Sequence, residues 1–200
     1  MTGTTQLRGS RTILTIGHSN QSQEAFIRLL RVHDVDVLVD VRSWPRSKYS
    51  PHFDARPLER AIRAAGTKYL FLGEELGGRP EGPQFYDEEG FVLYYEVART
   101  TRFRAAIERL ARGSELCRIA VMCSEEDPTS CHRRLLLGRV LQERDIRIEH
   151  IRASGHLVPE ASIAHGHHAQ AALFGKSEDS EWKSSQSVLR RRAQQRSLEP

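Results

Sequence analysis

The stretch CSEEDPTSCHRR, which begins at Cys123, concentrates side chains that can do chemistry. It holds two of the chain's three cysteines, Cys123 and Cys131, and the second is followed at once by His132 and Arg133. A thiol beside cationic groups or at a helix start has a lowered pKa and can act as a nucleophile. We therefore take both cysteines as catalytic candidates, with His132 as proton carrier and Glu125 as an orienting carboxylate.

Three other interpretations fit the same stretch. The two sulfurs could form a redox pair if the loop between them lets them meet. They could bind a metal together with a histidine, but seven residues between two cysteines is not a common zinc spacing, so we assign no metal ligands. Either cysteine could also be an ordinary core residue, and Cys131 lies four residues before Leu135. We expect Asp127 to cap a helix with Cys131 in its first turn, Cys131 to be mainly structural, and Cys123 to be the more reactive thiol.

Two further segments could bind an anion. In GHSN, His18 can act as acid or base, and Ser19 and Asn20 can bind a phosphate or simply cap the next helix. The segment DVRSWPRSKYSPHF mixes arginines, a lysine and aromatic rings, which suits a nucleotide or a nucleic-acid strand, although a solvated loop has the same composition. The candidates in this second segment are Asp40, Arg42, Arg46 and Ser47.

A third segment, GEELGGRP, places Glu75 before a glycine turn and Arg79 after it. A desolvated carboxyl group there could do acid or base work, or the glycines could merely form the turn. The catalytic candidates are thus Cys123, Cys131, His18, His132, Glu75 and Glu125, and the anion-binding candidates are Ser19, Asn20, Asp40, Arg42, Arg46, Ser47, Arg79 and Arg133. We expect Arg42 and Arg133 to share one anion site.

Short apolar runs must position these residues. The runs TILTIG, VDVLVDV, KYLFLG, RIAVMC and IRIEHI alternate with segments of helical periodicity. This alternation predicts one α/β domain with about five mostly parallel strands and helices on both faces, in Rossmann-like or flavodoxin-like layering. Each polar segment follows a strand, and ligands bind such sheets at the carboxyl ends of the strands. IRIEHI alternates apolar with polar residues, which predicts an edge strand.

The chain divides into three parts by composition. We expect a flexible N-terminus over residues 1–11, the α/β domain over 12–152, and a disordered basic and polar tail over 153–200. The tail contains an HGHH cluster, residues 165–168, which we interpret as incidental.

Bulk composition narrows the function classes only a little. The net charge of +4 permits anionic partners without requiring them. Three cysteines in 200 residues do not form a disulfide framework, and no apolar run is long enough for a signal peptide or a membrane span, so we expect a cytoplasmic protein. Neither a cofactor nor an oligomeric state follows from the sequence.

The order of the motifs TIGHSN, LVDVRSWPRS with PHF, YLFLGEELGGR, VMCSEEDPTSCHRRLL and IEHI resembles the domain of unknown function 488 family from Thr12 to about Arg152. The resemblance implies one shared site and names no reaction. The family's recurring residues correspond here to Gly17, His18, Ser19, Asp40, Arg42, Pro45, Ser47, Phe53, Leu76, Gly77, Gly78, Cys123, Glu125, Cys131, His132 and Arg133.

Three hypotheses about function remain from the sequence. The first is an enzyme that binds a phosphate-bearing or nucleotide-like substrate in a cleft at the strand ends and uses the cysteines and histidines. The second is a non-catalytic nucleic-acid-binding module that uses the basic, aromatic segment and the RRR of the tail. The third is a metal or redox sensor.

Overall fold

Six strands form one sheet in the order β3-β2-β4-β1-β5-β6. The computed structural model describes residues 11–163 and 182–188. The strands are β1 (Thr12–Gly17), β2 (Val37–Asp40), β3 (Lys68–Phe71), β4 (Ile119–Cys123), β5 (Arg147–Ile151) and β6 (Leu157–Pro159). The first five are parallel to their neighbours, and β6 runs antiparallel to β5. The prediction of a single α/β domain with a mostly parallel sheet is confirmed.

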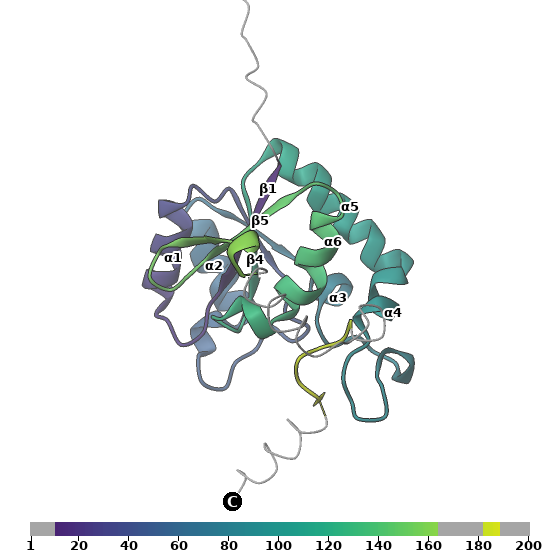
Figure 1. Ribbon diagram of the computed structural model, residues 1–200. Helices are drawn as coiled ribbons and strands as arrows, with labels where there is room; N and C mark the ends of the chain where they lie inside the picture. The colour runs from purple at the N-terminus through teal and green to yellow at the C-terminus, as the bar shows by residue number, and fades with distance from the viewer. Residues whose placement is uncertain (1–10, 164–181, 189–200) are drawn as a thin grey trace, which may run out of the picture.

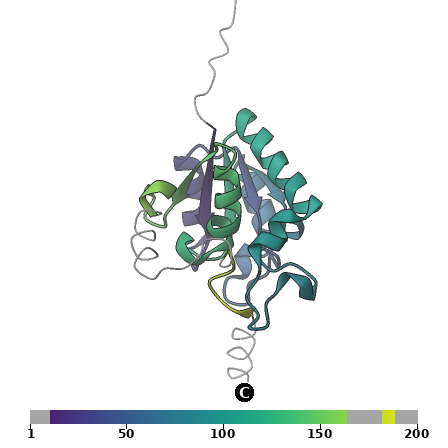
Figure 2. The same cartoon turned by 45° about the vertical axis from the view of Figure 1, so that its right-hand side comes forward.

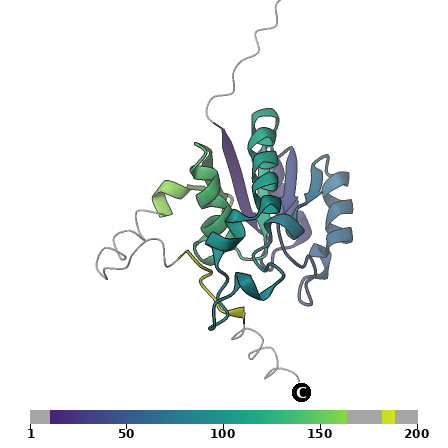
Figure 3. The same ribbon diagram turned by 90° about the vertical axis from the view of Figure 1, so that its right-hand side faces the viewer.

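Helices cover both faces of this sheet (Figure 1). The α-helices are α1 (Gln23–Val32), α2 (Ala55–Ala64), α3 (Gly73–Leu76), α4 (Tyr94–Arg99), α5 (Thr101–Leu116) and α6 (Arg139–Gln142). Helices α1 and α2 pack on one face and α4 to α6 on the other. In Figure 3, α5 and α6 stand in front of the strands. Short 3₁₀ turns span Pro51–Phe53, Pro83–Phe85 and Pro128–Ser130, and a π-helical segment, Arg133–Gly138, leads into α6.

The apolar strand runs supply both halves of the core. In β1, Ile13 belongs to the cluster under α5 and α6, whereas Leu14 and Ile16 belong to the cluster under α1 and α2. Successive side chains of a strand point to opposite faces, so a strand covered on both sides must be apolar throughout. This is why the runs read as continuous apolar segments.

The fifth predicted strand differs from expectation because it is not an edge. β5 pairs with β1 on one side and with β6 on the other. Its polar His150 is fully buried and is hydrogen-bonded to Thr15 and to Glu160. The polar alternation that suggested solvent exposure therefore reflects an internal hydrogen-bond network.

The chain after Arg152 is also more structured than expected wherever the structure describes it. β6 adds a strand beyond the predicted boundary, and Glu160 binds Arg134. The segment 182–188, yellow in Figures 1 and 2, lies beside α6 and the chain before α4. There Trp182 donates from Nε1 to the Leu135 carbonyl at 2.7 Å, and Ser184 donates from its amide to the Val92 carbonyl at 2.9 Å.

The remaining expectations about the chain ends lie outside the described residues. These are residues 1–10 of the N-terminus that we expected to be flexible over 1–11, the HGHH cluster at 165–168 and the RRR of the tail. In the part that the structure describes, no helix has the length and apolar character needed to cross a membrane.

Candidate functional site

A cavity of about 290 Å³ opens where the chain leaves the carboxyl ends of β2 and β4. Its walls come from the loops after β2, β3 and β4, from the chain before α4, and from the segment 182–188. The lining residues include Arg42, Ser43, Trp44, Arg46, Gly78, Arg79, Tyr94, Cys123, Glu125, Ser130, Cys131, His132, Ser184, Ser185 and Gln186. The predicted convergence of the post-strand segments is therefore present, and the C-terminal segment adds a wall that the sequence did not suggest.

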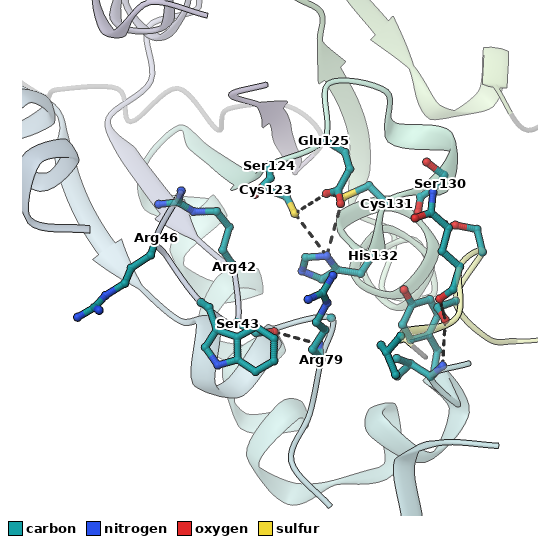
Figure 4. A pocket seen from close by; sticks show the side chains of 18 residues that line it. Arg42, Ser43, Arg46, Arg79, Cys123, Ser124, Glu125, Ser130, Cys131 and His132 are labelled. Carbon is teal, nitrogen blue, oxygen red and sulfur yellow. Dashed lines mark hydrogen bonds between the residues drawn. The ribbon is translucent and has the colours of Figure 1, made fainter. Parts of the chain in front are cut away.

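A cluster of two sulfurs, an imidazole and a carboxylate faces this cavity (Figure 4). Cys123 is 5% exposed and Cys131 is 1% exposed, and both thiols are free. The Glu125 Oε2 atom lies 3.0 Å from the Cys123 Sγ and 3.4 Å from the Cys131 Sγ. The His132 Nδ1 atom lies 3.6 and 3.8 Å from the same two sulfurs. We call these four residues the thiol cluster.

The local chain path differs from the predicted single helix. Asp127 accepts a hydrogen bond from the Thr129 amide and caps only the short turn Pro128–Ser130. Cys131 then has extended backbone angles, and its carbonyl accepts from the amides of Arg134 and Leu135. Cys131 thus precedes the first turn of the next helix instead of lying inside one capped by Asp127, and its sulfur turns toward Cys123.

The surroundings of the two cysteines affect their ionisation in different directions. Burial opposes ionisation, but the hydrogen bond with Cys123 and the positive charges of Arg133 and His132 lower the pKa of Cys131 well below its usual value. The hydrogen bond with Cys131, burial and the negative charge of Glu125 raise the pKa of Cys123. These shifts favour one shared proton, held on Cys123, and a thiolate on Cys131.

The other two members of the thiol cluster are charged as well. Burial raises the pKa of Glu125, but hydrogen bonds from Cys123 and from its own backbone outweigh burial and bring the value to about 2. Burial lowers the pKa of His132, but the hydrogen bond and negative charge of Cys131 outweigh it and raise the value overall. The carboxylate of the thiol cluster is therefore ionised, and the shifts favour ionisation of Cys131 and protonation of His132.

The loop after β4 is held in place by Arg133. Its guanidinium donates to the carbonyls of Glu125 and Glu126 and to the Thr15 hydroxyl, and the residue is 1% exposed. Arg133 does not line the cavity, whereas Arg42 does. The expected shared anion site of Arg42 and Arg133 is therefore not formed, because Arg133 is used to fix the carbonyls that carry Glu125 into position.

A family comparison agrees with this arrangement. The family model described as Domain of unknown function DUF488 matches residues 22–140, more than half of the chain. The chain belongs to this family. No curated protein and no solved structure matches it.

Several of the DUF488 residues that the resemblance singled out serve to bring the site together. A Cβ on Gly17 would overlap the Glu125 carbonyl, and a Cβ on Gly78 would lie 2.7 Å from the His132 ring. Glycine at these positions lets β1 approach the loop after β4 and lets the loop after β3 cover His132.

Asp40 and Arg42 form a buried pair behind the cavity wall. Arg42 donates from Nε to Asp40 at 2.9 Å and from Nη2 at 2.6 Å, and from Nη1 to the His18 Nε2 at 3.2 Å. Tyr69 donates its hydroxyl to Asp40 at 2.7 Å. Asp40 therefore positions Arg42 and does not itself bind an anion.

His18 is a structural residue in this arrangement. Its Nδ1 donates to the Ser19 carbonyl at 2.8 Å, while Nε2 accepts from Arg42, and the ring stacks on Phe53 at 4.3 Å. Burial and the positive charge of Arg42 lower its pKa to about 4, so the ring is neutral at physiological pH. With both nitrogens engaged and the residue outside the cavity lining, His18 does not fit the predicted role of proton carrier.

Four further candidates also lie outside the cavity lining. The Ser19 amide donates to the Ser124 carbonyl, and Asn20 is exposed. Ser47 stabilises its own turn through Asp54 and Ser50. Glu75 lies 3.7 Å from Arg102 on the surface. Each of these residues follows a strand, as expected, but none of them lines the cavity beside the thiol cluster.

Arg46 and Arg79 do line the cavity, together with Trp44. The Arg79 side chain points toward His132 in Figure 4, whereas that of Arg46 extends away from the thiol cluster. The Arg79 guanidinium lies 5.5 Å from the Trp44 ring, and Trp44 is 61% exposed.

The sequence analysis missed the contributions of Ser43, Tyr94 and Ser184 to the walls. One signal was present for the last of these. A tryptophan, Trp182, occurs in the polar stretch KSEDSEWKSSQS of the tail, and such a residue favours an apolar surface that can bury its ring.

Proposed function

We propose that this protein is a cysteine-dependent enzyme that acts on a small phosphate-bearing molecule in the cavity. The observation that carries the proposal is that the thiol cluster and the Arg79 side chain line the same cavity, with Arg79 pointing toward His132 (Figure 4). Such a mixture of buried thiols, a carboxylate, an imidazole and arginines contributes little to stability and suits a reacting centre.

The size and chemistry of the walls favour a small anionic ligand. The cavity, at about 290 Å³, is at the lower end of the range of small-molecule sites. A guanidinium group can donate two parallel hydrogen bonds to a phosphate group, which makes Arg79 a suitable phosphate ligand. The exposed Trp44 ring beside Arg79 offers a surface for a flat group, so a nucleoside phosphate suits both features.

The thiol cluster supplies the reactive groups. Cys131 as a thiolate can attack an electrophilic centre or bind a metal, and His132 Nδ1 can exchange a proton with the Cys131 sulfur. Glu125 is ionised and can accept a proton from water.

The binding experiment measures the affinity for pyrophosphate and for ADP by titration calorimetry at low salt. Arg79→Ala is expected to weaken binding about tenfold or more, because a hydrogen bond to a charged group is worth about 1.5–3 kcal/mol. The matched control is Arg99→Ala, an exposed arginine on α4 away from the cavity, and it should bind as the wild type does. Equal affinities for the Arg79→Ala variant and the wild type would contradict the proposal.

A second arm tests catalysis with a screen of phosphate esters and anhydrides. Cys131→Ser should keep the affinity of the wild type and lose turnover, whereas Cys117→Ser, outside the thiol cluster, should keep both. If the Cys131→Ser variant turns over substrate as fast as the wild type, the enzyme is not cysteine-dependent.

The same titration separates the enzyme from a nucleic-acid-binding module. Tyr49 is 88% exposed in the basic loop after β2, as a base-stacking residue would be. Tight binding of a single-stranded oligonucleotide that falls steeply with salt and is indifferent to both Arg79→Ala and Cys131→Ser would favour the module.

A further inference from the structure

We propose that Cys123, Cys131 and His132 bind one zinc ion through two sulfurs and one nitrogen, with the fourth coordination position open to the cavity. This inference deepens the proposed function. The catalytic use of the metal rests on that function, whereas metal binding is argued from the geometry alone. The three donor atoms, two Sγ and the imidazole Nδ1, lie within 4.8 Å of one another, and all three residues are buried.

The distances match tetrahedral coordination better than hydrogen bonding. With Zn–S of about 2.3 Å and Zn–N of about 2.0 Å, a tetrahedral angle places sulfur and nitrogen about 3.5 Å apart. The His132 Nδ1 lies 3.6 Å from the Cys123 Sγ and 3.8 Å from the Cys131 Sγ. One imidazole nitrogen cannot make a linear hydrogen bond to two sulfurs at once, but one metal ion can bind all three atoms.

The imidazole of His132 is already oriented for a metal. Its Nε2 lies 3.1 Å from the Val41 carbonyl and donates its proton there, so in the neutral ring the Nδ1 lone pair faces the sulfurs. Metal-binding histidines usually fix their other nitrogen in this way. Gly78 packs against the same ring, where a Cβ would come within 2.7 Å, so the ring has little freedom to turn away.

The charge of the pocket also favours a divalent cation. The Glu125 carboxylate contacts both sulfurs, so ionising both thiols would place three negative charges together in a buried site. The nearby guanidinium of Arg133 is already bonded to two carbonyls and a hydroxyl. A divalent ion would neutralise both thiolates, and a set of two sulfurs and an imidazole suits zinc and not magnesium or calcium.

The open position gives the metal a catalytic character. Catalytic zinc sites have three protein ligands and a water in the fourth position, whereas structural sites are closed by a fourth protein ligand. Glu125 is not among the three mutually close donors, and it remains beside the sulfurs to accept the proton of a bound water. Arg79, which points toward His132, can hold the phosphate of a substrate at that position.

The first experiment uses the full-length wild-type protein. Zinc content after purification under reducing conditions should be one ion per chain. Replacing zinc with cobalt should produce a tetrahedral spectrum with thiolate charge-transfer absorption. Zinc should also slow iodoacetamide alkylation of Cys123 and Cys131 in the metal-stripped protein, measured by mass spectrometry for each cysteine, while Cys117 alkylates at the same rate with and without zinc.

The second experiment compares matched variants. Cys123→Ser, Cys131→Ser and His132→Gln should each weaken zinc binding at least about tenfold, measured by competition with a chromophoric chelator. Cys117→Ser and Glu125→Gln should bind zinc with the wild-type stoichiometry, because neither residue belongs to the three donors. Circular dichroism identifies any variant that fails to fold. If a variant does not fold, the effect of zinc on alkylation of the wild-type protein tests the zinc site instead.

Two results would overturn the zinc site. One is a reduced protein that takes up no zinc and whose Cys123 and Cys131 alkylate equally fast with and without the metal. The other is a disulfide between Cys123 and Cys131 that forms readily and is the state isolated without reductant, with no metal bound after reduction. After either result, the anion titration with Arg79→Ala still tests the proposed function. Conversely, a wild-type protein that binds zinc but no anion would refute the proposed function and leave the zinc site standing.

Discussion

At the scale of single residues, Asp40 organises the wall of the cavity. Its carboxylate is completely buried and accepts four hydrogen bonds, three from Arg42 and one from Tyr69. Burial and the negative charge of Asp40 raise the pKa of Tyr69, so the phenol remains a donor. A buried ion pair is most costly to break when one partner is removed and the other stays charged.

This difference predicts unequal effects for two conservative substitutions. Asp40→Asn leaves Arg42 buried without its counter-charge and should lower the free energy of unfolding by about 3–5 kcal/mol. Tyr69→Phe removes one of the four hydrogen bonds and should cost about 1–2 kcal/mol. Urea denaturation at neutral pH measures both. Similar losses for the two variants would show that the ion pair is not the main contribution of Asp40.

At the scale of elements, the end of β1 sets the position of the loop after β4. Gly17 pairs with Cys123 in the sheet, and a Cβ on Gly17 would overlap the Glu125 carbonyl and lie 2.8 Å from the Glu126 Cα. The backbone atoms in the way cannot rotate aside as a flexible side chain could. The carboxylate of the thiol cluster therefore depends on a glycine in another strand.

Gly17→Ala should lower the free energy of unfolding by about 1–3 kcal/mol, the usual cost of overpacking, and should weaken zinc and anion binding by displacing Cys123 and the loop that follows it in the cavity wall. Gly138→Ala is the matched control, because its nearest contact would be the Arg133 carbonyl at 3.4 Å and alanine favours helix. Chemical denaturation and the two binding assays measure both variants. Wild-type stability and binding in Gly17→Ala would mean that the loop can move without loss.

At the scale of the whole molecule, the chain beyond Arg152 completes the domain. Glu160 binds Arg134 at 2.7 Å and His150 at 2.9 Å, and so joins the π-helical segment that follows Cys131 and His132 to β5. Burial acts to raise the pKa of Glu160, but the hydrogen bonds from His150 and Arg134 outweigh burial and lower it.

A lowered pKa in the folded state gives this carboxylate a defined pH dependence. The contribution of Glu160 is complete above its ordinary pKa of 4.5 and is lost as the pH falls through the lower folded-state value. Glu160→Gln should therefore lower the free energy of unfolding by about 3 kcal/mol at pH 7, and the difference from the wild type should shrink below pH 4.5.

The control for this pH series is Glu59→Gln, which removes an exposed pair with Arg63. It should change the stability by less than about 1 kcal/mol at any pH. Urea denaturation across the acid range measures all three proteins. A difference between Glu160→Gln and the wild type that stays constant down to the lowest pH would show that ionisation of Glu160 does not stabilise the fold.

The sequence by itself determined the class of fold and the neighbourhood of the site. Alternating apolar runs and helical segments depend on local periodicity, which a chain displays without its partners, so the parallel α/β domain was predictable. The cluster of Cys123, Glu125, Cys131 and His132 was predictable for a related reason, since all four follow one strand within a few residues.

Tertiary structure decided the role of each side chain. Arg42 and Arg133 have the same chemistry and both follow strands, yet one reaches the cavity and the other is bonded to buried carbonyls. His18 is neutral because burial and the positive charge of Arg42 lower its pKa. The proposed zinc site depends on two sulfurs and one nitrogen that converge only in the folded chain. These outcomes depend on which partners lie within hydrogen-bonding distance, and that is set by packing between segments far apart in the chain.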